Sequence, residues 1–172
     1  MPRKPHELFD TPEQKADLEA RDGLLQFEAV QKMVAASSAG FTFTPATLLE
    51  LHRLAIADIY TCAGTFRTGG VVLLRGGTVD YAQHQPPDWQ KVVPYVEEMC
   101  DYVNRNFTKS AIHLASYVMW RHNWIHPFFG GNGRVSRAAS YFVLCARLGF
   151  YLPGTNTIPN QIEQTQIHTM TR

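Results

Sequence analysis

The stretch His126-Pro-Phe-Phe-Gly-Gly-Asn-Gly-Arg-Val-Ser-Arg137, HPFFGGNGRVSR in one-letter code, decides how this chain folds. Pro127 lacks an amide donor and clashes with a preceding helical turn, so it ends the apolar, helix-patterned run before it. Gly130 and Gly131 then permit positive φ angles and a tight loop. We therefore expect a helix, a glycine-rich loop and a second helix that begins at about Gly133.

Two arginines, Arg134 and Arg137, fall in the first turns of that second helix, three residues apart and thus on one face. Free backbone amides and the positive end of the helix dipole already favour an anion there, so two more positive charges are unfavourable unless something negative binds. A polyphosphate would satisfy both, because glycine-rich amides can cradle one phosphate while guanidinium groups bind the next. The alternative is an ordinary turn between core helices, with solvated arginines.

Taken together, these residues resemble the signature of the Fic (Fido-fold) family, H-x-F-x-(D/E)-G-N-G-R-x-x-R. Seven of the eight specified positions match, namely His126, Phe128, Gly131, Asn132, Gly133, Arg134 and Arg137. The eighth position, an acid in the family, is Gly130 in this chain.

The resemblance implies a protein adenylyltransferase, which transfers AMP from ATP to a hydroxyl side chain of a target protein. His126 would be the catalytic general base that takes the proton from the attacking hydroxyl, a role that suits an imidazole. Arg134 and Arg137 would bind the β- and γ-phosphates of the donor.

The resemblance also implies roles for the rest of the loop. Asn132, together with the backbone amides around Gly131 and Gly133, would stabilise the charge that develops at the α-phosphate. Phe128 would anchor the loop in the core, which its apolar character also indicates without the family.

Gly130 leaves three interpretations open. In the family the acid at this position coordinates the Mg²⁺ that bridges the donor phosphates, and glycine has no side chain to do so, so we predict no protein metal ligand. Mg²⁺ could still enter with ATP through phosphate oxygens and water. Otherwise the chain is a catalytically weak or inactive nucleotide-binding regulatory module, or a transferase that uses a different diphosphate donor.

Residues 71–81, VVLLRGGTVDY, predict a β-hairpin because Gly-Gly suits a two-residue turn between β-prone runs. The preceding Ala63-Gly64-Thr65-Phe66-Arg67 resembles the G-x-[FY]-R element that often comes before the flap in Fic proteins. The resemblance implies that hairpin 71–81 is a flap at which the target protein docks by strand pairing. A small structural hairpin that covers the core is an equal alternative.

Capping signals and helical spacing predict a mostly α fold, and the resemblance implies the Fic/Fido helical fold with a small β-hairpin flap. We expect helices over about 12–36, 45–56, 89–105, 110–125 and 133–148, and a last one from about 158. Residues 1–44 would form an N-terminal segment and helix, and 45–172 a single Fic core domain. In the first helix we expect Leu24, Leu25 and Phe27 on the apolar side and a weak point or break at Gly23, and in the fourth we expect Ile112 to face inward.

Composition excludes several classes of protein. A length of 172 residues fits one domain, and 45% apolar and 18% charged residues are typical of a soluble globular protein. A net charge of +1 gives no reason to expect nucleic acid or an acidic membrane as partner. The start has no signal-peptide pattern and no run could span a bilayer, so we expect a cytoplasmic protein.

Two further patterns bear on metal binding and on inhibition. His122 and His126 have i, i+4 spacing, but no third ligand is evident and zinc is disfavoured. Many Fic proteins are restrained by a helix with (S/T)-x-x-x-E-(G/N), whose Glu competes for the arginine that corresponds to Arg137. Neither Glu19 nor Glu28 fits that pattern. A separate inhibitor protein would then supply inhibition, unless Gly130 makes restraint unnecessary.

Overall fold

The computed structural model describes residues 6–71, 74–75, 78–79 and 84–152. Within these residues the chain is mostly helical, as the sequence predicts. The helices are α1 (Pro12–Ala36), α2 (Pro45–Ile56), α3 (Val92–Arg105), α4 (Ala111–Ile125) and α5 (Asn132–Leu148), with short 3₁₀ segments η1 (Ser37–Ala39) and η2 (Trp89–Lys91). None of the described helices combines the length and apolar character needed to cross a membrane.

Hydroxyl side chains cap the amino ends of three of these helices. Thr11, Thr44 and Ser110 each accept a hydrogen bond from a backbone amide in the first turn of α1, α2 and α4. Such a cap typically stabilises a helix by about 1 kcal/mol, because it pairs an amide that has no intrahelical partner. At the other end of the chain, α5 ends at Gly149, whose φ of 81° suits glycine.

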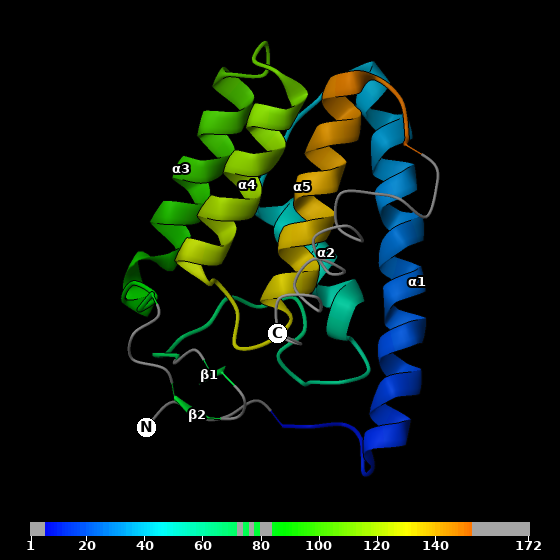
Figure 1. The fold of residues 1–172 in the computed structure, drawn as a ribbon, viewed down its shortest axis with the longest axis vertical. Coiled ribbons are helices and arrows are strands. Elements are labelled where there is room, and N and C mark those ends of the chain that lie inside the picture. The colour runs from blue at the N-terminus through cyan, green and yellow to red at the C-terminus, as the bar shows by residue number, and fades with distance from the viewer. Residues whose placement is uncertain (1–5, 72–73, 76–77, 80–83, 153–172) are drawn as a thin grey trace, which may run out of the picture.

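Helix α5 is the central element of the fold. It packs against α4, α2 and α1, while α3 packs on the far side of α4. Figure 1 shows α3, α4, α5 and α1 side by side, with α2 behind α5 and the α4–α5 loop at the same end of the molecule as the hairpin. This loop is the glycine-rich part of the stretch from His126 to Arg137.

The core lies between these helices and is built from apolar side chains that the helical spacing brings together. Phe43, Leu48 and Val143 are fully buried, and each such side chain stabilises the fold by roughly 1.5–3 kcal/mol. Arginine and histidine are also present in it: Arg67, His52 and His122 are almost wholly buried. All three lie close to the α4–α5 loop.

The prediction for α1 was wrong in two respects. The helix continues through Gly23 without a break. Leu24 and Phe27 are exposed, at 58% and 49%, whereas the buried positions include Asp22 and Gln26. Gln26 donates to the carbonyl of Leu51, so part of the contact between α1 and α2 is polar. Apolar residues alone therefore do not identify the inner face of this helix.

In α4 the expectation for Ile112 was also wrong, since its side chain is 68% exposed. The inner face instead consists of Leu114, Ala115, Val118, His122 and Ile125. These positions follow helical spacing only when the polar His122 is counted with the apolar residues.

The hairpin appears as two short antiparallel strands, β1 (Leu74–Arg75) and β2 (Thr78–Val79), in which Leu74 pairs with Val79 and Arg75 with Thr78. The predicted Gly76-Gly77 turn and the helix expected from 158 lie outside the described residues.

Candidate active site

The α4–α5 loop begins at a residue with an unusual backbone. α4 ends at Ile125, and His126 follows in the left-handed conformation, with φ 49° and ψ 60°. Among the described residues it is the single non-glycine residue with positive φ. This conformation costs an L-residue roughly 1–2 kcal/mol, so its surroundings must enforce it. The residue proposed as the base is therefore held at a fixed turn in the chain.

Asn132 closes the loop that follows. Its side-chain oxygen accepts from the backbone amide of Phe128 at 3.0 Å, and its side-chain nitrogen donates to the carbonyl of Phe128 at 2.8 Å. The amide group of asparagine has a second N–H donor, which this clip does not use. The predicted contact of Asn132 with an α-phosphate stays a prediction, and the structure adds a second task to this side chain.

Phe128 lies at the centre of the loop and is fully buried. Its ring stacks on the His52 ring, with centroids 3.7 Å apart and an interplanar angle of 10°, and on the Phe66 ring at 5.4 Å. These contacts fix the loop against α2 and against the segment that leads to the hairpin. The position is the one that a loop anchor requires.

His52 ties the same loop to α2 through both ring nitrogens. The backbone amide of Gly64 donates to Nδ1 at 3.1 Å, so Nδ1 is unprotonated and Nε2 must carry the proton. Nε2 then donates to the carbonyl of Gly130 at 3.1 Å. Burial lowers the pKa of His52 to about 4, against a raising effect from the Gly130 hydrogen bond and a further lowering by Arg134. Nothing in the spacing of His52 along the sequence indicates either bond.

The amino end of α5 carries no capping side chain. Gly131 occupies the N-cap position with φ 72°, and the amide of Val135 makes the first helical bond, to the carbonyl of Gly131. The amides before Val135 therefore lack intrahelical partners, and an anion is the natural partner for them. Glycine is required at 131, because a Cβ there would lie 2.9 Å from the Ile56 side chain.

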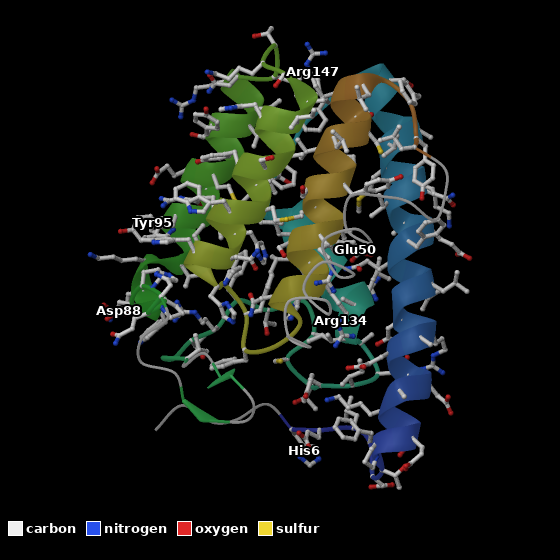
Figure 2. The ribbon with its side chains drawn as sticks, viewed as in Figure 1. His6, Glu50, Asp88, Tyr95, Arg134 and Arg147 are labelled. Carbon is white, nitrogen blue, oxygen red and sulfur yellow. The ribbon has the colours of Figure 1, made fainter. Side chains whose placement is uncertain are left out.

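The two arginines take different directions from this helix end. Arg134 donates to the carbonyl of Ala55 at 2.7 Å and to the carboxylate of Glu19 at 3.1 Å. Figure 2 shows Arg134 at the lower end of α5, on the side that faces α1 and α2. Arg137 folds back over the first turn, with Nη1 3.3 Å from the point where a Cβ of Gly133 would lie. Both remain at the amino end of α5, but Arg134 is partly engaged elsewhere.

The Glu19 contact is a site feature that the sequence did not reveal. The helix that carries it has no (S/T)-x-x-x-E-(G/N) match, and Glu19 lies 115 residues from Arg134 along the chain. No sequence signal marks such a pair. Within the described residues Arg137 forms no ion pair.

The environment of His126 keeps its imidazole neutral. Its pKa is lowered to about 4, first by burial and then by the positive charge of Arg67, while the Asn123 carbonyl raises it and His84 lowers it. A neutral imidazole has a free lone pair at neutral pH and can accept a proton. The side chain thus meets the charge requirement for a general base.

The residues present do not form a metal site. Among the described residues no group of three or more His, Cys, Asp or Glu side chains is placed to hold a cation. At Gly130, where the family has its acid, there is room for a side chain, since a Cβ would meet Tyr60 at an ordinary 3.7 Å. Glycine itself offers a metal no side-chain ligand at this position.

A separate open pocket of about 530 Å³ lies along α4, lined by His84, Ser116, Met119, Trp120, Asn123 and Trp124. His84 donates through Nε2 to the Trp124 carbonyl at 2.7 Å, and the two rings stack. Neither motif arginine lines this pocket, so it is distinct from the anion site at α5.

Comparisons with known proteins show which fold and which family this chain shares. Two of the solved structures that share the fold are Fic proteins. One is a Fic domain containing signaling protein from Bacteroides thetaiotaomicron, with a TM-score of 0.67 and 20% identity over 80% of this chain and 51% of that chain. The other is a Fic family protein from Desulfovibrio desulfuricans, with a TM-score of 0.66 and 21% identity over 92% of this chain and 44% of that chain. The chain spans about half the length of these proteins. Residues 42–144 match the Fic/DOC family, and this stretch includes the whole of the loop and the first turns of α5. The chain therefore belongs to the Fic/DOC family.

Proposed function

We propose that this chain is a protein adenylyltransferase, which transfers AMP from ATP to a hydroxyl side chain of a target protein. The observation that carries the proposal is the uncapped amino end of α5, where free amides and the helical turns with Arg134 and Arg137 follow a loop that begins at the neutral imidazole of His126. Amides and guanidinium groups bind phosphate, and a neutral imidazole accepts a proton.

In the proposed reaction the target hydroxyl oxygen attacks the α-phosphorus of ATP. Its proton passes to the imidazole of His126, the bond to the bridging oxygen breaks, and pyrophosphate leaves with its charge held by Arg137 and Arg134. Amides at Gly131 and Gly133 and the unused N–H of Asn132 would stabilise charge on the α-phosphate in the transition state. Hairpin 71–81 would receive the target segment. ATP would bring Mg²⁺ through its phosphate oxygens rather than through a carboxylate at position 130.

Two observations favour a second candidate, a nucleotide-binding regulatory module with weak or no transfer. Gly130 supplies no metal ligand, and Arg134 is already held by Glu19. A third candidate keeps group transfer but uses another diphosphate donor, since the phosphate contacts do not specify a base.

Transfer from ATP labelled on the α-phosphate, with competing unlabelled donors, separates the three. We expect labelled AMP to appear on a target protein, and we expect unlabelled ATP to reduce this labelling more than other unlabelled donors do. His126→Ala should lower the rate by roughly 10²–10⁴, the usual contribution of a general base, with ATP affinity by calorimetry unchanged. His113→Ala, an exposed histidine of α4 that bonds to Tyr102, is the matched control. A His126→Ala protein that transfers label as fast as wild type would refute the assignment.

A further inference from the structure

Arg67 is a fully charged side chain that is only 2% exposed, and the reaction described above makes no use of it. Burying a guanidinium is costly unless its donors are paired. Among the residues that the structure describes, each of its acceptors is a backbone carbonyl. Asp88, at the start of η2, is the counter-charge that acts on it, and burial lowers the pKa of Arg67 despite that charge.

The bonds of Arg67 converge on the turn that contains His126. Nε donates to the carbonyl of His126 at 2.8 Å, and Nη2 donates to the carbonyl of Ile125 at 3.3 Å. The backbone amide of Arg67 donates to the carbonyl of Pro127 at 2.9 Å. One residue thus binds three consecutive carbonyls at the carboxyl end of α4, where the helix dipole also favours a positive charge.

The other bonds of the same side chain reach the segment that carries the hairpin. Nη1 donates to the carbonyl of Gly69 at 3.0 Å, before β1, and Nη2 donates to the carbonyl of Pro87 at 2.6 Å, after β2. Arg67 therefore holds the turn at His126 against both ends of the hairpin segment. A planar guanidinium with several donors in fixed directions can do this, and a lysine ammonium cannot reproduce it.

The conformation of His126 indicates what the contact with Arg67 does. A left-handed backbone in a non-glycine residue is unfavourable, and it aims the carbonyl of His126 at Nε of Arg67. We propose that Arg67 is the positioning residue for the candidate base, holding His126 in the left-handed turn and so aiming its imidazole. The kinetic part of this inference rests on the proposed function, whereas the conformational part does not.

Charge supports the same assignment. The groups that act on the His126 ring are Arg67, His84, the carbonyl of Asn123 and the neighbouring His122. Arg67 has the largest effect after burial, and as a cation it disfavours the protonated ring, so its removal should raise the pKa of His126 from about 4.

Two substitutions separate position from charge. Arg67→Lys keeps the charge but removes the planar guanidinium with its several donors, and Arg67→Gln removes the charge as well. Arg147→Lys is the matched control, because Arg147 also donates to backbone carbonyls, those of Lys109 and Thr108, at the opposite end of α4. NMR of histidine-labelled protein, with His126 assigned from a His126→Gln spectrum, reports backbone shifts and titration midpoint without requiring activity. Steady-state kinetics adds kcat and KM.

In Arg67→Lys we expect the His126 backbone shifts to leave the positive-φ range and kcat to fall about 10²-fold, the typical effect of misplacing a reacting group by about 1 Å. KM for ATP should stay within about twofold, because the α5 cradle is untouched, and Arg147→Lys should match wild type. Arg67→Gln should in addition raise the His126 midpoint. If Arg67→Gln does not fold, the lysine variant alone decides the question.

His126 shifts and kcat in Arg67→Lys that equal those of Arg147→Lys would overturn the inference. A rise in KM with kcat unchanged would also overturn it, because it would place Arg67 in support of the cradle rather than of the base. If wild type transfers no nucleotide while the His126 shifts respond as described, the proposed function fails and the positioning role stands.

Discussion

The guanidinium of Arg134 is bound by the carboxylate of Glu19, 3.1 Å away, although the two residues are separated by 115 positions in the chain. Their side chains are 25% and 40% exposed, so the pair contributes at most about 1 kcal/mol. A phosphate that binds Arg134 has to share or replace this contact. The free protein is therefore partly closed to the anion that its loop suits.

Removing that carboxylate should strengthen nucleotide binding. Glu19→Ala frees one edge of Arg134, and the lost competition of up to about 1 kcal/mol corresponds to an increase in ATP affinity of up to about fivefold. Calorimetry at low salt measures it, and the increase should shrink as salt screens the pair. Glu28→Ala, also on α1 and exposed, is the control. Equal affinities in wild type and Glu19→Ala at low salt would contradict a competition between Glu19 and the nucleotide for Arg134.

Restoring the acid at position 130 should create a metal ligand. A side chain fits there, because its Cβ would meet Tyr60 at 3.7 Å and no positive φ disfavours it. Gly130→Asp should increase the Mg²⁺ dependence of ATP binding by about tenfold or more, in line with the effect of groups around metal ligands. Gly130→Asn has the same shape without the charge and should not do so. Transfer that is unchanged in Gly130→Asp at limiting Mg²⁺ would contradict the metal argument.

The adjacent glycine should tolerate no side chain. At Gly131 the φ is 72° and a Cβ would approach the Ile56 methyl to 2.9 Å, whereas the space at Gly130 is ordinary. Gly131→Ala should lower the free energy of unfolding by roughly 2–4 kcal/mol, from the left-handed backbone and the overlap together. Gly130→Ala is the matched control and should be close to neutral. Urea denaturation compares the two, and similar losses would place the strain elsewhere.

Stability should fall as the pH drops below 6.5. Burial lowers the pKa of His52 and His126 to about 4 and that of His122 to about 3. Between pH 6.5 and 4 the unfolded chain therefore binds more protons than the folded one, and stability decreases by about 1.4 kcal/mol per pH unit for each histidine that stays neutral. Above pH 6.5 these three groups add no further dependence.

His122→Leu tests this assignment. Within the described residues neither ring nitrogen of His122 has a hydrogen-bond partner, so the substitution removes one titrating group and no bond. The slope of unfolding free energy against pH, measured by urea denaturation, should decrease by the contribution of one proton, about 1.4 kcal/mol per pH unit. Ser140→Ala removes a buried polar group that does not titrate and should leave the slope as it is. An unchanged slope in His122→Leu would mean that His122 is protonated in the folded protein.

Much of the fold could be predicted because its signals are local. Thr44 before Pro45 starts α2, and Pro127 stops the helix before it, through contacts within four residues of chain. The inner faces were less predictable. Leu24 and Phe27 look like core residues by spacing, but Asp22 and Gln26 take the inner face, where one carboxylate oxygen of Asp22 accepts from the amide of Asp58 and Gln26 donates to the carbonyl of Leu51.

The sequence by itself determined the helix boundaries, the glycine-rich loop and the family motif, since each depends on neighbouring residues and on backbone preferences that side chains impose locally. Only the tertiary structure decided what holds that loop: the Nε2 proton of His52 on Gly130, the grip of Arg67 on the carbonyl of His126, and Glu19 against Arg134. These partners lie 59 to 115 residues apart. Their contacts exist because α1, α2 and the segment before the hairpin pack around the amino end of α5, and no spacing rule along the chain encodes that packing.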